Sequence, residues 1–190
     1  MSRRRCVFSL LLCLATAAIH EKASAQVGGD EAHVKAAFVY NFMKFVEWPA
    51  DAMQRSGDSL VVAVIGDGGV ADAAERFLAG KLIGDRRIVV HRARWDQSLA
   101  GAQVAFVTET DAKRLRRIFD AATSHAILSI GDADGFATSG GIIGLVIEDR
   151  KVRFDVDITA ADAAGLKLSS RLLTLSRVVH SGKSKPGERQ

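Results

Sequence analysis

Short, continuous apolar runs constrain the fold of this chain more than any other feature. Residues 60–65 read LVVAVI and leave no polar side chain on either face. A half-exposed strand alternates apolar and polar residues, whereas an unbroken run is typical of a strand buried on both faces of a parallel sheet. Further runs occur at residues 88–90, 104–107 and 126–130. We therefore expect a sheet whose central strands lie between two layers of helices.

Helical patterns lie between these runs. Residues 70–78 and 111–119 have apolar side chains at helical spacing, and Leu115, Ile118 and Phe119 face inward in the second segment. Strands that alternate with helices favour α/β architecture with a largely parallel sheet.

The C-terminal part follows a different pattern. Residues 142–147 and 152–158 flank the polar turn EDRK and predict an antiparallel hairpin, because the second segment alternates apolar and polar residues. A short helix, a glycine and a final helix follow, with Leu172, Leu173, Leu175 and Val179 facing inward. The fold class that we predict is therefore α/β: a single domain with a mixed, mostly parallel sheet covered by helices, a C-terminal antiparallel hairpin and a final helix.

The first residues have the features of an export signal. Three arginines at 3–5 precede a short apolar run at 7–19, and Ala23-Ser24-Ala25 supplies the small residues that signal peptidase accepts. The run is too short to span a membrane. We expect a secretory signal peptide at 1–25 that is cleaved after Ala25, a single exported domain at 26–180 and a disordered tail at 181–190.

Cleavage would change both charge and redox chemistry. The mature chain keeps 22 Lys and Arg against 21 Asp and Glu, a net charge of about +1, so nucleic-acid binding has little electrostatic support. Cys6 and Cys13 lie in the signal peptide and are removed by its cleavage. The mature protein therefore has no disulfide, although its compartment would permit one.

No motif for catalysis, cofactor or metal binding survives inspection. GDGGVA at 66–71 matches a loose dinucleotide fingerprint, but the following run ends at His91-Arg92 instead of an acidic residue. DADG lacks the first and last ligands of a calcium loop. The remaining histidines (His33, His91, His125 and His180) lack metal-ligand spacing. We predict no enzyme and no cofactor. A small-molecule binder or enzyme that uses the Gly66–Gly69 turn remains the alternative.

Two groups of residues are candidates for partner binding. The stretch AAFVYNFMKFVEWP (residues 36–49) and the residues just before it carry a stripe of Val34, Phe38, Phe42 and Phe45 that is expected to pack inward. Tyr40, Met43 and Glu47 fall on the opposite side, with Trp48 near its edge. A helix that is apolar on two sides is covered twice, either inside its own domain or against another chain.

The second group is basic. Arg153 lies on the polar face of the hairpin, and Arg171 and Arg177 lie in the terminal segment. Together they would cradle an anion or an acidic partner, or they are simply solvated charges.

Taken together, long stretches of this sequence resemble the YfiR family of exported bacterial proteins over residues 32–179. The matching stretches are KAAFVYNFMKFVEWP, VVAVIGDGG, AGKLIGDRRI, LSIGDADGFATSGG and GGIIGLVIEDRKVRFDVDITAADAAGLKLSSRLLTLSRVV.

The resemblance implies a periplasmic α/β repressor. It implies that the protein binds the periplasmic sensor domain of an inner-membrane diguanylate cyclase and holds the enzyme inactive, thereby limiting cyclic di-GMP and biofilm. It also implies capture by an outer-membrane lipoprotein, and a homodimer. Some members respond to redox state through disulfides, but this chain has no cysteine after residue 25. Asp157 stands where many relatives carry Asn.

Overall fold

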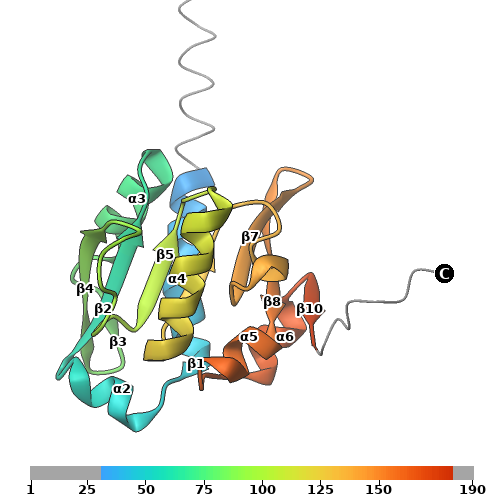
Figure 1. The fold of residues 1–190 in the computed structure, drawn as a ribbon. Helices are drawn as coiled ribbons and strands as arrows, with labels where there is room; N and C mark the ends of the chain where they lie inside the picture. The colour runs from blue at the N-terminus through green and yellow to red at the C-terminus, as the bar shows by residue number, and fades with distance from the viewer. Residues whose placement is uncertain (1–30, 182–190) are drawn as a thin grey trace, which may run out of the picture.

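The computed structural model describes residues 31–181 of the chain, which form an eight-stranded sheet and a separate two-stranded pair (Figure 1). The spatial order of the large sheet is β10-β8-β7-β6-β5-β2-β4-β3, and β1 pairs with β9. The predicted export signal (1–25) and almost all of the predicted tail (181–190) lie outside the described residues. The strands are β1 Val46–Glu47, β2 Ser59–Ile65, β3 Leu82–Ile83, β4 Arg86–Ala93, β5 Val104–Val107, β6 Leu128–Gly131, β7 Ile143–Glu148, β8 Lys151–Asp157, β9 Lys167–Leu168 and β10 Val178–His180.

Strand directions confirm the mixed, mostly parallel sheet. The five central strands β4, β2, β5, β6 and β7 run parallel to one another. Strands β3, β8 and β10 run the other way, since β3 is antiparallel to β4, β8 is antiparallel to β7 and β10 follows the direction of β8. Strand β10 is parallel to β8 and forms one edge. Strand β2 pairs with β4 on one side and with β5 on the other, so the order of strand addition reverses at β2.

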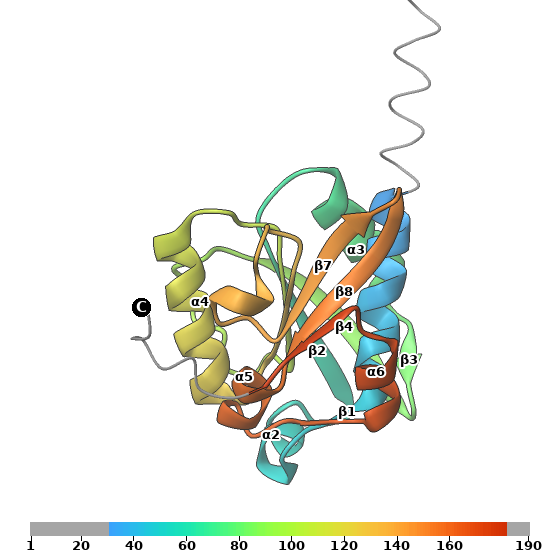
Figure 2. The ribbon, with the colours of Figure 1, turned by 90° about the vertical axis from the view of Figure 1, so that its right-hand side faces the viewer.

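Helices cover both faces of the sheet. The N-terminal helix (residues 31–42) and α3 pack on one face, and α4 packs on the other, as Figure 2 shows. Along β2, Leu60, Val62 and Val64 belong to the first core, whereas Ala63 and Ile65 belong to the second. The remaining helical elements are η1 Met43–Phe45, α2 Ala50–Arg55, α3 Gly69–Leu78, α4 Ala112–His125, η2 Ala137–Ser139, α5 Ile158–Ala163 and α6 Ser170–Leu175.

The buried stripe of the N-terminal helix differs from the predicted one. Its most buried members include Ala36, Val39 and Phe42, whereas Val34 is 43% exposed. Phe38 and Phe45 pack only at the margin of the core. Because alanines have short side chains, the helix lies close to the sheet on its alanine side, and the larger Phe38 lies beside it, against Phe42 and Phe154.

A lysine occupies one position of this buried stripe. The ammonium group of Lys35 is 3.0 Å from Asp132, which follows β6, and 2.9 Å from Glu31. Burial alone lowers the pKa of Lys35, but the hydrogen bonds to Glu31 and Asp132 outweigh it and the pKa is raised. The ion pair therefore joins the start of the helix to the sheet.

Side-chain caps begin three of the predicted helices: α4, α5 and, through Ser169, α6. Asp111 accepts hydrogen bonds from the backbone N–H groups of Lys113 and Arg114, and α4 starts at the next residue. Asp157 accepts a hydrogen bond from the backbone N–H of Ala160 and starts α5. Asn caps a helix as well as Asp does, so the Asp157 difference preserves this role.

The C-terminal segment corrects part of the prediction. The hairpin β7–β8 forms as expected, with Asp149 and Arg150 at positive φ in its turn. The final helix, however, stops at Leu175, and residues 178–180 form β10. Leu175 is 63% exposed and Val179 is 38% exposed, so neither faces inward as predicted.

Candidate functional site

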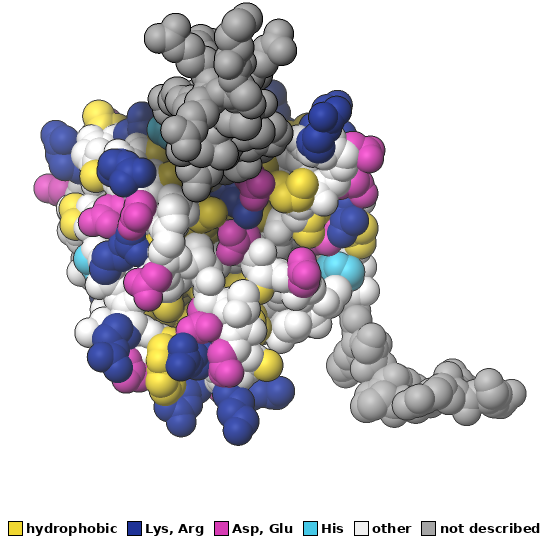
Figure 3. Space-filling view, turned by 90° about the horizontal axis from the view of Figure 1, so that it is seen from above, with side chains coloured by type: hydrophobic (Ala, Val, Ile, Leu, Met, Phe, Trp, Pro, Cys, Tyr) yellow, Lys and Arg dark blue, Asp and Glu magenta, His cyan; other side chains and the backbone are white. Residues whose placement is uncertain are grey.

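A cleft opens at the carboxyl ends of β2, β4 and β5. Its volume is about 610 Å³, and it lies where the order of strand addition reverses around β2. Open α/β sheets commonly bind ligands at this position. Figure 3, which views the molecule from above, shows acidic and basic side chains intermingled around the uncovered part of this end. The cleft is lined by Ile65, Gly66, Asp67, Asp72, Arg92, Ala93, Arg94, Trp95, Gln97, Glu109 and Arg114.

Arg92 forms one wall and is fully engaged by its own chain. It donates to the carbonyl of Gly66 at 2.9 Å, to Glu75 at 2.9 Å and to Asp72. Hydrogen bonding to Glu75 is the main cause that raises the pKa of Arg92. This guanidinium therefore holds the turn after β2 against α3 and β4.

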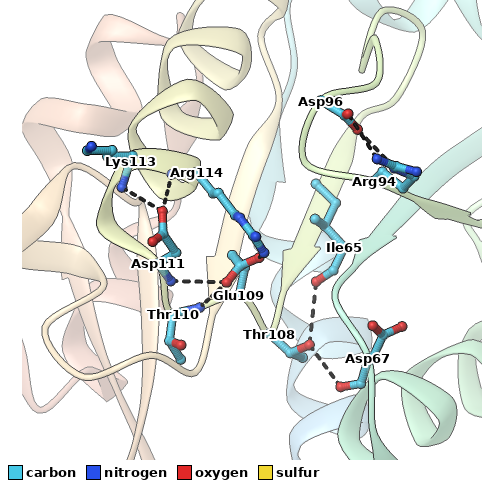
Figure 4. Close-up of polar contacts among 10 residues, drawn as sticks. All are labelled: Ile65, Asp67, Arg94, Asp96, Thr108, Glu109, Thr110, Asp111, Lys113 and Arg114. Carbon is cyan, nitrogen blue, oxygen red and sulfur yellow. Dashed lines mark hydrogen bonds and ion pairs between the residues drawn. The ribbon is translucent and has the colours of Figure 1, made fainter.

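The opposite wall is built by Glu109 and Arg114. Glu109 accepts a hydrogen bond from Arg114 at 2.8 Å and from the backbone N–H groups of Thr110 and Asp111 at 3.0 Å each (Figure 4). The hydrogen bond from Arg114 is the main cause that lowers the pKa of Glu109. The guanidinium of Arg114 also lies 5.4 Å from the ring centroid of Trp95. Glu109 thus orients a cation that rests on an aromatic ring.

The first residue of the glycine turn after β2, Gly66, has no room for a side chain. Gly66 has φ +109, and a Cβ there would lie 2.3 Å from Oγ1 of Thr108 on β5's exit loop. Gly68 has φ +93 and precedes α3 directly. Steric packing against Thr108 therefore explains Gly66 of the fingerprint-like sequence without any ligand.

Tyr40 packs against its own chain. Its hydroxyl donates to the carbonyl of Leu82 at 3.0 Å, and its ring meets Phe77 edge to face. The ammonium groups of Lys44 and Lys81 lie 4.1 and 5.7 Å from the ring centroid. We call Tyr40, Phe77, Lys44 and Lys81 the aromatic–lysine surface. Tyr40 remains half-buried, so part of this surface meets solvent.

Met43 is not on a second surface, and this part of the prediction is wrong. The residue is 1% exposed and belongs to the core. The α-helix ends at residue 42, and residues 43–45 form a 3₁₀ turn. Met43 follows Val39 by four residues and Ala36 by seven, so it shares their buried face, whereas the predicted stripe was drawn through the phenylalanines.

Glu47 and Trp48 lie away from the aromatic–lysine surface, beside the two-stranded pair. Glu47 is exposed and faces Lys167 in the register of β1 with β9. The indole of Trp48 donates to the carbonyl of Gln103 at 3.0 Å. Both line a shallow hollow of about 270 Å³ with Pro49 and Gly165.

The three predicted arginines have three different surroundings. Arg177 forms a bidentate pair with Asp155, at 2.9 and 2.6 Å, and lies 3.5 Å from Glu148. Hydrogen bonding to Asp155 raises the pKa of Arg177. Arg171 lies 6.0 Å from the ring centroid of Phe45, and Arg153 is exposed. The charge of Arg177 is thus already balanced within the chain, which argues against a shared cradle.

The sequence prediction missed the residues of the cleft. Glu109, Arg114 and Trp95 follow predicted strands or start a predicted helix, and polar residues after parallel strands gather at one edge of a sheet. This position after a predicted strand could have identified Glu109 from the sequence. Trp95 follows the longer strand β4, whose end at Ala93 lies beyond the apolar run.

Residues 31–181 have neither a metal-ligand cluster nor a membrane-spanning helix. That part of the chain holds no cluster of three His, Cys, Asp or Glu side chains that could bind a metal ion. It also contains no helix that is long and apolar enough to cross a bilayer.

Comparison with solved structures gives partial likeness only. A conserved domain protein from Vibrio cholerae O1 biovar El Tor strain N16961 is 12% identical with a TM-score of 0.47. An ABC domain in complex with L-Trp from Streptococcus pneumoniae is 9% identical with a TM-score of 0.48. In both cases the match covers 68% of this chain and 58% of the other. The chain thus spans less than two thirds of these structures.

Comparison with families is more informative. No curated protein matches this sequence. A family model described as YfiR/HmsC-like matches residues 32–177, which is nearly the whole described domain. The chain therefore belongs to the YfiR/HmsC-like family.

Proposed function

We propose that this chain is a periplasmic regulatory protein that represses an inner-membrane diguanylate cyclase by binding the cyclase's periplasmic sensor domain. The observation that carries the proposal is the match to the YfiR/HmsC-like family over residues 32–177. The export signal predicted at 1–25 agrees with a periplasmic location, and a homodimer and capture by an outer-membrane lipoprotein belong to the same proposal.

The aromatic–lysine surface supports a partner site on this chain. Lys44 and Lys81 lie over aromatic rings, and neither forms an ion pair within residues 31–181. Aromatic residues are enriched at protein interfaces, and unpaired cations favour a partner of opposite charge. We assign Tyr40 and these lysines to the contact and expect carboxylates on the cyclase domain. Glu47, Trp48, Arg153, Arg171 and Arg177 remain proposed partner residues at other positions.

The first test is direct association. The mature chain (residues 26–190) would be mixed with the periplasmic domain of the diguanylate cyclase encoded nearest to its gene, and binding would be measured by calorimetry. Membranes that contain the full cyclase should make less cyclic di-GMP when the mature chain is added. If the two proteins do not associate and cyclase activity is unchanged, the regulatory proposal fails.

Charge reversal tests the assigned surface. Lys81→Glu should weaken binding by about tenfold, because an interface anchor contributes about 1–2 kcal/mol. Lys113→Glu is the matched control, since Lys113 is an exposed lysine on α4, on the opposite face of the sheet. Equal weakening by both variants would show a non-specific charge effect instead of a site.

A further inference from the structure

We propose that the cleft at the carboxyl ends of β2, β4 and β5 binds a small organic acid, whose carboxylate or phosphate group is held by Arg94 and Arg114. This inference goes beyond the regulatory function. The volume of the cleft, about 610 Å³, lies within the range of small-molecule sites in proteins. Some hydrogen-bonding groups of the cleft are already used by the protein, and those that remain determine what the cleft can bind.

Arg94 and Arg114 keep unused donors on different walls of the cleft. Arg94 gives two of its nitrogens to Asp96, at 3.1 Å each, and its third has no acceptor within residues 31–181. Arg114 gives one nitrogen to Glu109, and its other two are likewise without an acceptor in that range. Figure 4 shows the two side chains on either side of Ile65. A guanidinium suits carboxylate and phosphate oxygens because its donors lie in one plane.

The surrounding groups hold Arg114 in place before any ligand arrives. Glu109 is only 16% exposed at its side chain and is bound by two backbone N–H groups as well as by Arg114. The ring of Trp95 lies beneath the same guanidinium. A side chain that is already oriented loses less conformational entropy on binding.

Asp67 narrows the class of ligand. Its carboxylate lines the same cleft, and the structure gives it no cationic partner within residues 31–181. This carboxylate, which has no cationic partner in the described residues, repels ligands that carry only anionic groups. The ligand should therefore combine one anionic group with hydroxyl or amino groups that donate to Asp67.

Trp95 supplies the readout. The sequence has only two tryptophans, Trp48 and Trp95, so Trp48→Phe leaves Trp95 as the single indole fluorophore. This protein would be titrated with D-glycerate, glycerol 3-phosphate and glycerol, and the same titrations would be followed by calorimetry on the wild-type chain. No cyclase is present, so the result is independent of the regulatory proposal.

We expect Trp95 emission to change with D-glycerate or glycerol 3-phosphate at millimolar concentration, but not with glycerol. The arm that responds identifies a carboxylate or a phosphate head. Arg114→Gln and Arg94→Gln should each weaken binding about tenfold, since a hydrogen bond to a charged group contributes about 1.5–3 kcal/mol.

Arg117→Gln is the matched control. Arg117 also lies near the Trp95 ring, at 5.2 Å, but it does not line the cleft, and its loss should change affinity less than about twofold, within the scatter of surface substitutions. The proposal is overturned if neither acid is bound, if glycerol binds equally well, or if all three arginine variants behave alike.

Discussion

The Glu109 carboxylate shows how single residues set the chemistry of the cleft. It is nearly enclosed, accepts one charged and two backbone hydrogen bonds, and has a pKa below its ordinary value of 4.5. A lowered pKa means that the folded protein favours the ionised carboxylate more than the unfolded chain does. Glu109 therefore stabilises the fold above pH 4.5, and this contribution is lost as the pH falls through the folded-state pKa.

Glu109→Gln should accordingly make the free energy of unfolding depend less on pH in the acid range. We expect the wild type to lose more free energy of unfolding than the variant as the pH falls below 4.5. Urea unfolding at a series of pH values measures this difference. Asp51→Asn is the control, because the Asp51–Arg55 pair is exposed and screened by solvent. Parallel profiles for wild type and Glu109→Gln would contradict the assignment.

Phe42 and Tyr40 are two residues apart and should respond very differently to substitution. Phe42 is 2% exposed and meets Phe154 at 4.8 Å between ring centroids, so Phe42→Ala should cost about 3–5 kcal/mol of stability. Tyr40→Phe removes only the half-exposed hydrogen bond to Leu82, worth about 0.5–1.5 kcal/mol.

Thermal denaturation of both variants would measure the difference. If Tyr40→Phe unfolds as easily as Phe42→Ala, the hydroxyl is a core contact and the aromatic–lysine surface is not available to a partner.

The candidate site could be predicted only in part from single residues. Tyr40 was identified because an aromatic residue on a second helical face is unusual, and the structure shows that its ring is half-buried. Arg94 and Trp95 follow β4, whereas Arg114 lies in α4 after β5, and residue spacing carries no information about the meeting of these two segments.

At the level of elements, β10 is docked by its pairing with β8 and by the ion pairs of the preceding Arg177. Arg177 precedes the strand and holds Asp155 of β8, whose side chain is 12% exposed. The outer edge of β10 has no neighbouring strand in the sheet of residues 31–181. Loss of Arg177 would leave a buried carboxylate without its partner, which is costly.

Arg177→Gln should therefore loosen β10 without unfolding the domain. Hydrogen exchange should accelerate at residues 178–180 and in the adjoining α6, while β2 in the sheet centre should keep its protection. Arg153→Gln, on the neighbouring strand but without an ion pair, should leave exchange unchanged. Uniform acceleration across the sheet would instead indicate that Arg177 contributes to global stability.

Elements with one strong local signal were predictable. The buried strands β2 and β5, helix α4 and the β7–β8 hairpin follow from apolar runs, a capped periodic segment and a polar turn. Strand β10 was mistaken for helix because three residues carry no usable period, and its pairing with β8 decides its conformation. The short elements α2, β3, β1 and β9 likewise depend on tertiary contacts.

At the scale of the whole molecule, residues 26–190 contain no cysteine, so no disulfide stabilises their fold. Both cysteines of the sequence lie in the predicted export signal, at residues 6 and 13. We expect the melting temperature and assembly state of residues 26–190 to be the same with and without a mild reductant. Differential scanning calorimetry and size-exclusion chromatography check this. A shift caused by the reductant would show that the chain is not cleaved after Ala25.

The pairing of β1 with β9 has a consequence for how the protein reaches its compartment. Val46 lies opposite Leu168, so one of the first segments to leave the ribosome finds its partner only when almost the whole chain has been made. Contacts between residues so distant in sequence form slowly. A nascent chain that cannot close its fold early stays extended, which is the state a narrow translocation channel requires. If the segment at 1–25 directs export, the late pairing of β1 with β9 would favour passage of the chain before this part of the fold has closed.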